Sequence, residues 1–157
     1  MTKETSTSAQ PVASSPLDRV PDFERLGGFH HALPIQFETV GPDKVVASME
    51  LGPDQHTPWG VVHGGVYTAA IETAASLGAS AAVLGRGQFA VGVNNNTDFL
   101  RPLVAGTVRV SAEPIQQGAT QQLWQVNITR TDNGKLVARG QVRLQNVPLP
   151  DAPADRA

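Results

Sequence analysis

The sequence predicts a single α+β domain in which one long apolar helix is covered by one antiparallel sheet. Two observations predict this class. The segment from about Gly64 to Leu84 is apolar nearly all round, as a buried helix is, and strand-like alternation lies on both sides of it. The 157 residues are 40% hydrophobic and 17% charged, which is typical of one globular domain with a sizeable core.

The strands are predicted by period-two alternation and by the turns between them. Apolar residues alternate from Val45 to Leu51, and a shorter strand near Gln36–Val40 pairs with this segment through a Gly-Pro-Asp turn. Four later strands are centred on residues 89–99, 108–112, 124–128 and 138–144. The last two are joined through residues 131–135, where Asn-Gly is a strong hairpin signal, and the short links favour antiparallel pairing.

Composition sets the limits of the domain and the range of its partners. Residues 1–18 are rich in Ser, Thr and Pro and are expected to form a disordered arm. Residues 19–147 are expected to form the domain, and residues 148–157 a flexible tail. Twelve basic and 14 acidic residues give a net charge of −2, so we expect no nucleic acid partner.

The same inventory bears on metals and membranes. The chain has no cysteine, which excludes a thiolate nucleophile and argues against structural zinc, so no metal site is expected. The first residues lack the apolar region of a secretory signal. The longest apolar stretch, residues 66–84, is interrupted by Glu72, so we expect no membrane association and a cytoplasmic location.

Glu72 is the only formally charged residue between Gln55 and Gly85, and it lies inside the predicted helix. It shares a helical stripe with Ser76, one turn later, so the two side chains can meet. A second stripe is the predicted core face: Val66, Ala70, Thr73, Leu77, Ala81 and Leu84. Glu72 therefore points away from the main core. A buried carboxylate is costly and usually marks a catalytic site, although a structural ion pair with an arginine is the alternative.

The step His63-Gly64-Gly65 stands where the helix begins. Glycines leave the backbone N–H groups uncovered and the helix dipole adds positive charge, so this step can polarise a carbonyl or hold an oxyanion. The alternative is that the glycines only form a tight turn. His63 is about 180° round a helix from Glu72, so it is interpreted as a pre-helix residue that orients the loop and not as the base.

The spacing of these groups predicts a site shared by two chains. Gly65 and Glu72 are seven residues apart in the sequence, which is roughly 10 Å along a helix axis. A reacting carbonyl needs its hydrogen-bond donor and its attacking group each within roughly 3 Å, so one chain can hardly supply both. Two antiparallel helices lying side by side can do so, with Gly64 from one chain and Glu72 from the other.

The run W-G-V-V-H-G-G with Glu72 after it, A-V-G at residues 90–92 and F-L-R-P at residues 99–102 resembles the hotdog-fold acyl-CoA thioesterases. It is most similar to the branch of the phenylacetic-acid-pathway (PaaI-like) and Arthrobacter-type 4-hydroxybenzoyl-CoA thioesterases. The similarity covers about residues 35–147. It implies the hotdog fold, a long central helix wrapped by an antiparallel sheet, in a homodimer that forms the active site and associates further into a homotetramer.

The resemblance also implies roles for individual residues of the reaction centre. Glu72 matches the catalytic carboxylate, acting as nucleophile or as general base. Gly64 matches the residue whose N–H polarises the thioester carbonyl at the helix start. Ser76 matches a hydroxyl that holds water near the carboxylate. Thr57 stands where relatives have a glutamine near the reacting group.

Further positions are expected to bind the substrate around the reaction centre. Arg101 matches a residue that meets a phosphate of coenzyme A. Thr120 matches one hydroxyl of a phosphate-contacting pair, and Ala119 lacks the other, so the nucleotide contacts must differ here. Gly65 belongs with the helix start, and Asn94 could line a pantetheine or acyl pocket, with a solvated strand end as the alternative.

Thioester hydrolysis fits this inventory. A thiol pKa near 8.5 makes a thiolate a tolerable leaving group. A carboxylate, an oxyanion site and water are then sufficient, and no cofactor is implied. The predicted function is hydrolysis of an acyl-CoA to a free acid and coenzyme A, with the acyl group left open. The alternatives are a hotdog hydratase or dehydratase, whose His and acidic residue are arranged differently, and a non-catalytic acyl-CoA-binding or sensor protein, which would not need Glu72.

Overall fold

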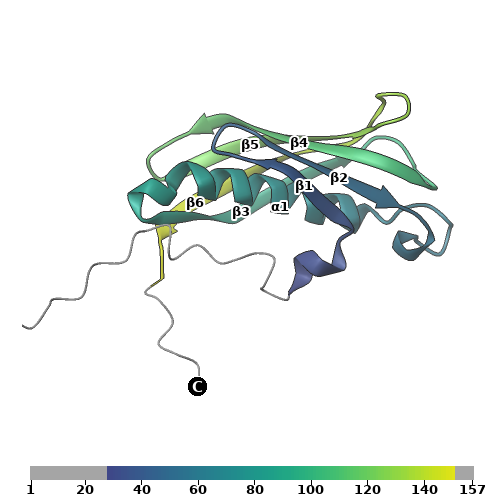
Figure 1. Ribbon diagram of the computed structural model, residues 1–157, viewed down its shortest axis with the longest axis horizontal. Coiled ribbons are helices and arrows are strands. Elements are labelled where there is room, and N and C mark those ends of the chain that lie inside the picture. Colours follow the sequence, from purple (N-terminus) through teal and green to yellow (C-terminus); the bar gives the residue numbers. More distant parts are fainter. Residues whose placement is uncertain (1–27, 151–157) are drawn as a thin grey trace, which may run out of the picture.

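The computed structural model describes residues 28–150 and shows one curved sheet packed along a long helix (Figure 1). The helix α1 spans Gly64–Val83, and three short 3-10 turns are η2 (Phe29–Ala32), η3 (Pro53–Gln55) and η4 (Leu84–Arg86). The six strands are β1 (Ile35–Val40), β2 (Val45–Leu51), β3 (Gln88–Phe99), β4 (Gly106–Gln117), β5 (Gln121–Arg130) and β6 (Leu136–Pro148). The predicted α+β class, with one central helix and one antiparallel sheet, is confirmed.

The strand order is β1-β2-β4-β5-β6-β3, and every neighbouring pair is antiparallel. β3 does not pair with β4, which follows it in the sequence, but lies at the far edge beside β6. The connection after β3, residues 100–105, passes the start of the helix, where the buried Leu103 accepts the Val62 N–H at 2.8 Å through its carbonyl. β3 is thus an edge strand beside α1, and β6 is its one strand neighbour within the described residues.

The buried face of α1 differs from the predicted core stripe. Of that stripe only Ala70 is buried, whereas Val66 and Leu77 are half-buried. Small side chains occupy the buried face because they let the helix approach the sheet closely; a Cβ on Gly78 would lie 2.5 Å from the Trp124 ring. The buried residues of the helix are Tyr67, Ala70, Ile71, Ala74, Ala75, Gly78, Ala79 and Val83. Glu72 lies off this face and is half-buried, as its stripe predicts.

Buried amides connect the C-terminal half of α1 to the sheet. Gln122 donates from Nε2 to the Ala79 carbonyl at 2.9 Å and to Asn146 Oδ1 at 2.8 Å, and its Oε1 accepts the Trp124 indole N–H at 3.0 Å. Asn146 in turn donates to two carbonyls of the β4–β5 turn. We call Gln122, Trp124 and Asn146 the amide network. Because its members bond to one another and to the backbone, their burial costs little.

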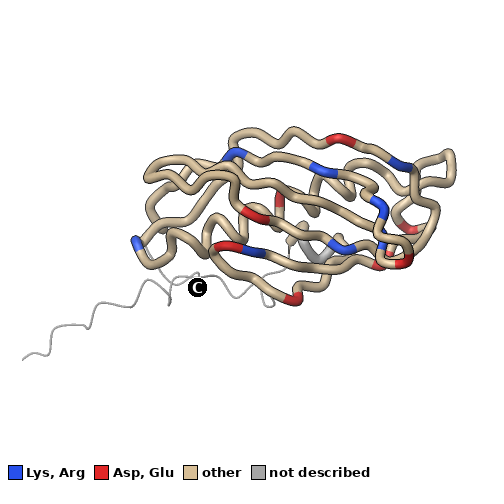
Figure 2. The backbone as a smooth tube through the Cα atoms, turned by 90° about the horizontal axis from the view of Figure 1, so that it is seen from above, with Lys and Arg blue, Asp and Glu red and all other residues tan. Residues whose placement is uncertain are grey.

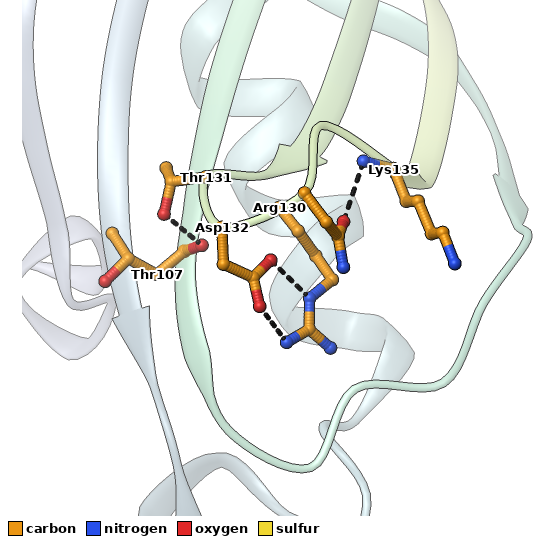
Figure 3. Close-up of polar contacts among 6 residues, drawn as sticks. Thr107, Arg130, Thr131, Asp132 and Lys135 are labelled. Carbon is orange, nitrogen blue, oxygen red and sulfur yellow. Dashed lines mark hydrogen bonds and ion pairs between the residues drawn. The ribbon is translucent and has the colours of Figure 1, made fainter.

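The predicted hairpin between β5 and β6 is present, and polar contacts hold its turn (Figure 3). Arg130 binds Asp132 at two points, with Nε to Oδ1 at 2.9 Å and Nη2 to Oδ2 at 2.6 Å. The hydrogen bond from Arg130 holds the pKa of the Asp132 carboxyl below its usual value. Thr131 ties the turn to β4 by donating its N–H and its hydroxyl to the Thr107 carbonyl. Gly134 closes the turn with a φ of 68°, which favours glycine.

The C-terminal limit of the domain lies beyond the predicted one. β6 continues to Pro148, and Leu149 is buried with its N–H donating to the Gly87 carbonyl at 2.9 Å. The domain therefore includes at least two residues of the predicted tail. The predicted arm, residues 1–18, lies outside the described residues.

Charge and hydropathy are distributed unevenly between sheet and helix. Basic and acidic residues are interspersed along the strands and loops (Figure 2). The segment Gly64–Arg86 has a mean hydropathy of 1.2 and is long and apolar enough to span a membrane, by length and composition only. The core helix of a globular domain passes the same test, and α1 packs along the sheet.

Candidate active site

A well-anchored loop leads into α1. The Val62 N–H donates to the Leu103 carbonyl and the His63 N–H to the Gln55 carbonyl, both at 2.8 Å. His63 is the residue before the helix, and its ring Nδ1 accepts the Gly65 N–H at 2.8 Å. His63 therefore lies directly before the helix, where the sequence placed it, and its role in orienting the loop stays a prediction. Its ring caps one of the backbone donors of the first turn.

Gly64, the first residue of α1, keeps its own N–H available. Among residues 28–150 no hydrogen bond uses that N–H, as is usual for a first-turn residue. The Phe99 side chain lies over Gly64, since a Cβ there would come within 2.9 Å of the ring. Phe99 is itself 58% exposed. The helix start thus presents one backbone donor, strengthened by the helix dipole, next to an exposed aromatic ring.

Two turns further along α1, the Glu72 carboxylate lies against β3. Its Oε2 accepts the Asn95 amide at 2.9 Å, and the same Nδ2 also donates to the Thr68 carbonyl at 3.2 Å. Its Oε1 lies on Gly92, where an added Cβ would overlap it. None of the ion pairs found in the described part of the chain includes Glu72, so the alternative of a structural ion pair with an arginine finds no support there.

Asn95 and Gly92 are contacts of Glu72 that sequence reasoning missed. The polar run of residues 94–96 was a signal, but it led to Asn94 as the candidate. Successive residues of a strand face opposite sides, so only the register decides which one meets the helix. The pairing of β3 with β6 shifts between Gly92 and Asn94, and this places Asn95 towards α1 and leaves Asn94 exposed.

Ser76 lies on α1 close to Glu72 in the sequence, and Thr57 lies in the turn before the helix. Ser76 lies one turn after Glu72 and is half-buried, and its hydroxyl makes no hydrogen bond to the residues that the structure describes. Thr57 shapes the turn before the helix: its hydroxyl accepts the Trp59 N–H at 3.3 Å, and its N–H donates to the Val61 carbonyl at 2.7 Å. Contact of Ser76 or Thr57 with a reacting group stays a prediction.

The two residues predicted to contact coenzyme A lie at opposite ends of α1. Arg101 follows β3 near the helix start and is exposed, with Nη1 donating to the Leu136 carbonyl at 2.6 Å. Thr120 lies in the β4–β5 turn, which the amide network joins to the C-terminal half of the helix through Ala79. One chain therefore does not bring Arg101 and Thr120 to the same phosphate.

Tyr67 adds a buried polar group that the apolar pattern of the helix conceals. It is 3% exposed, and its hydroxyl has no hydrogen-bond partner among the residues described. Its ring centroid lies 6.5 Å from that of Phe99. Burial raises the pKa of Tyr67 above 10.0, and the nearby charge of Arg130 offsets part of this rise.

Two clefts open on this side of the molecule. One of about 400 Å³ adjoins the helix start and is lined in part by His56, His63, Gly65 and Val66. A larger one of about 780 Å³ lies where β1 begins and β2 ends and contains none of the predicted site residues, so the smaller cleft is the better candidate for a substrate. Residues 28–150 contain no group of three or more His, Asp or Glu side chains placed to hold a metal ion.

The chain is similar to one family profile and to several known proteins. The sequence profile of the Thioesterase superfamily matches residues 60–137. A protein of Mycobacterium tuberculosis (strain ATCC 25618 / H37Rv) named "Putative esterase Rv1847" is 50% identical over 121 residues, which cover 76% of this chain and 86% of the relative. The solved structure of that relative has a TM-score of 0.75 at 48% identity and covers 78% of this chain and 98% of its own.

Two further relatives have names that specify an activity. A 1,4-dihydroxy-2-naphthoyl-CoA hydrolase of Listeria monocytogenes is 32% identical over 102 residues, covering 65% of this chain and 82% of the relative. The crystal structure of thioesterase HI1161 from Haemophilus influenzae has a TM-score of 0.69 at 34% identity and covers 77% of this chain and 83% of its own. The branch within the superfamily stays a prediction. The chain belongs to the thioesterase superfamily, has the hotdog fold and is a thioester hydrolase.

Proposed function

We propose that the chain hydrolyses an acyl-CoA thioester to a free acid and coenzyme A, with Glu72 as the reacting carboxylate. The observation that carries this proposal is a half-buried carboxylate in an otherwise apolar helix, held by Asn95 and outside every ion pair of the described residues. Removing a carboxylate from water lowers stability, so a group of this kind is a candidate for a role in the reaction. The Listeria relative, named as the hydrolase of an aromatic acyl-CoA, supports this substrate class.

Two routes lead to the same products. In the nucleophilic route, a Glu72 oxygen bonds to the thioester carbon, the C–S bond breaks, and the sulfur leaves as the thiolate of coenzyme A; water then hydrolyses the resulting anhydride. In the general-base route, Glu72 takes a proton from water as the water oxygen attacks the carbon, and the same C–S bond breaks. In both routes the Gly64 N–H stabilises the negative charge that develops on the carbonyl oxygen.

We further propose that two copies of the chain build each site. Gly64 and Glu72 stand eight residues apart on one straight helix, about 12 Å along its axis, which is too far to share one carbonyl. β3 presents a 12-residue edge beside α1, and an open edge of this length is a ready template for pairing with a second copy. An antiparallel neighbour would also reverse the ends that carry Arg101 and Thr120. The homotetramer stays a prediction.

Thiol release tests the activity. The purified chain is incubated with acetyl-CoA, octanoyl-CoA and benzoyl-CoA, and free coenzyme A is measured with DTNB. We expect release from at least one ester and a loss of roughly 10³-fold or more in kcat for Glu72→Gln. Glu50→Gln is the matched control, since Glu50 is exposed on β2 and in no ion pair of the described chain. No release from any ester by the wild-type chain would favour the non-catalytic acyl-CoA-binding alternative.

Mixed chains test the shared site. Gly64→Pro removes the N–H donor, and proline is tolerated at the first helical position because His63 already has extended backbone angles (φ −67°, ψ 132°). Gly64→Ala is its control, because it adds the same Cβ beside Phe99 and keeps the N–H. We expect each of Gly64→Pro and Glu72→Gln to be inactive alone and their co-expressed mixture to recover activity, since half of the sites in a mixed dimer are intact. Absence of recovery in a mixture that contains mixed dimers would exclude the shared site.

Isotope labelling separates the two routes. A single turnover is run in water enriched in oxygen-18, and the peptide containing Glu72 is weighed by mass spectrometry. Label in Glu72 indicates the anhydride route, since water then attacks an acyl bond to the side chain. Label in the free acid alone shows that water attacks the substrate carbon, which happens in the general-base route and also when the anhydride is hydrolysed at that carbon.

A further inference from the structure

The Glu72 carboxylate is held by a neighbour whose own orientation is controlled. Asn95 donates from Nδ2 to Glu72 Oε2 at 2.9 Å and to the Thr68 carbonyl at 3.2 Å. Its Oδ1 accepts the Thr97 hydroxyl at 2.7 Å. All three distances lie in the range of well-formed hydrogen bonds. Thr97, Asn95 and Glu72 thus form a chain of side chains that links β3 to α1.

The orientation of the Asn95 amide follows from these partners. An asparagine side chain has an acceptor and a donor end that differ little in shape. With the amide turned over, its oxygen would face two acceptors, the Glu72 carboxylate and the Thr68 carbonyl, and its NH₂ would lie at the Thr97 hydroxyl. The arrangement with NH₂ towards Glu72 satisfies all groups at once. The two acceptors, Glu72 Oε2 and the Thr68 carbonyl, therefore set the orientation of the amide, and the Thr97 hydroxyl, which can donate or accept, holds the amide oxygen at its other end.

The two oxygens of Glu72 are consequently unlike. Oε2 is occupied by Asn95, whereas Oε1 lies over Gly92 and accepts no hydrogen bond from residues 28–150. Oε1 is unpaired but not fully buried, since the Tyr67 hydroxyl is the one fully buried polar side-chain atom without a partner in residues 28–150, so solvent reaches Oε1. A side chain at position 92 would occupy the space that Oε1 uses.

We propose that Asn95 and Thr97 are positioning residues: Asn95 binds Glu72 Oε2, Thr97 holds the Asn95 amide, and Oε1 is left as the oxygen that reacts. This inference rests on the proposed function, since it needs Glu72 as the reacting carboxylate. A purely structural Asn95 would be expected mainly to satisfy the backbone. However, an α-helix already supplies a donor to the Thr68 carbonyl from four residues on, so that bond alone does not require Asn95.

The test compares hydroxyl-deleting and hydroxyl-keeping variants, assayed with whichever of acetyl-CoA, octanoyl-CoA and benzoyl-CoA the wild type cleaves fastest. We expect Thr97→Val to lower kcat about 10-fold and Asn95→Ala about 100-fold, because loss of a partner that orients a reacting group costs factors of this size. KM should change by less than about threefold, since neither residue needs to touch the ester. Thr97→Ser keeps the hydroxyl and should restore kcat to within about threefold of wild type.

Controls separate the positioning role from folding and from the proposed function. Asn127→Ala makes the same change at an exposed position on β5 and should leave kcat unaltered. A Glu72→Gln chain that keeps full activity would refute Glu72 as the reacting group. Inactive Glu72→Gln with wild-type kcat in both Asn95→Ala and Thr97→Val would refute the positioning role alone. Equal losses in Thr97→Val and Thr97→Ser, or a loss carried by KM, would also overturn it.

Discussion

The two halves of α1 differ in the hydrogen bonding of the polar groups beside them. Beside the C-terminal half, the buried side chains of Gln122, Trp124 and Asn146 bond to one another or to backbone carbonyls. Beside the N-terminal half, the Tyr67 hydroxyl and Glu72 Oε1 have no hydrogen-bond partner in the described chain, and neither has the Gly64 N–H. A buried polar group left unpaired costs about 1–3 kcal/mol, whereas a paired one is nearly neutral. The pairing beside the C-terminal half favours stability, and we propose that the unpaired groups beside the N-terminal half serve a ligand.

Glycines show the same contrast. Gly78 in the C-terminal half makes room for the rigid Trp124 ring, and Gly92 beside the N-terminal half makes room for a flexible carboxylate. A methyl group added at Gly78 must displace a packed aromatic side chain. A methyl group added at Gly92 must displace only the end of Glu72. The same substitution should thus affect stability at one site and activity at the other.

Gly92→Ala should break the N-terminal half of the comparison. The new Cβ would overlap Glu72 Oε1 and push the carboxylate off its position without disturbing the core. We expect kcat for the best acyl-CoA to fall roughly 100-fold or more, equivalent to about 2.7 kcal/mol in the barrier, with a thermal midpoint close to that of wild type. Gly85→Ala is the control, because no atom lies within 4 Å of a Cβ there. Wild-type kcat in Gly92→Ala would show that the position of Oε1 does not matter.

Gln122→Leu should break the other half of the comparison. It deletes the bonds to Ala79, Asn146 and Trp124 and leaves a buried indole N–H and a buried amide oxygen without their partner. We expect a loss of about 2–4 kcal/mol in the free energy of unfolding, measured by urea denaturation at fixed protein concentration. Gln116→Leu, at an exposed position on β4, should change it by less than about 0.5 kcal/mol. A similar loss in both variants would mean that the amide network is not special.

Tyr67→Phe has the smallest expected effect and the opposite sign. Removing a buried unpaired hydroxyl should raise the free energy of unfolding by about 1 kcal/mol at pH 7. A decrease instead would show that water or a ligand satisfies the hydroxyl.

The pH dependence of Tyr67 sharpens that result. The pKa of Tyr67 is raised in the folded chain, so its contribution to stability is present below the unfolded pKa of about 10 and is lost as the pH rises through the folded value. Tyr67→Phe should remove this alkaline loss. Since Tyr67 is the only tyrosine, absorbance at 295 nm during an alkaline titration reports it alone. A midpoint at or below pH 10 would contradict the raised pKa.

Much of the fold could be predicted, because its signals are local. Alternation located β2 and the later strands, the Gly-Pro-Asp turn placed β1 beside β2, and Asn-Gly marked the β5–β6 turn. The place of β3 beside β6 could not be predicted, since it depends on where residues 100–105 cross the helix start. The predicted core face of α1 was wrong. The prediction followed hydrophobic size and chose Leu77 and Leu84, whereas close approach to the sheet favours alanine and glycine.

The candidate site residues also differ in whether their signal is local in the sequence or depends on the fold. Glu72 and Gly64 could be proposed as site residues because a lone charge in an apolar helix and glycines at a helix start are visible in the sequence. Asn95 and Gly92 meet Glu72 only through the register of β3, which shifts at a bulge that no residue type announces. Tyr67 was not predicted as a polar site residue, because an aromatic ring in an apolar segment usually packs in the core. Only the structure shows that its hydroxyl is unpaired within the described residues.

The pairing of β3 with the last strand has a consequence for synthesis of the chain. The partners along these two strands are separated by 39 residues at Phe99 and Ala138 and by 60 residues at Gln88 and Pro148. Contacts of such long range form slowly, and on a ribosome they must wait for β6 to emerge. Gly140 of β6 packs against Ile71 and Thr97, so the strand that carries the Glu72 contacts is supported only then. A nascent or truncated chain lacking β6 would leave the apolar surface of α1 and the edge of β3 uncovered. Exposed surface of this kind is prone to aggregation and is bound by chaperones, so the chain would need this protection until β6 pairs.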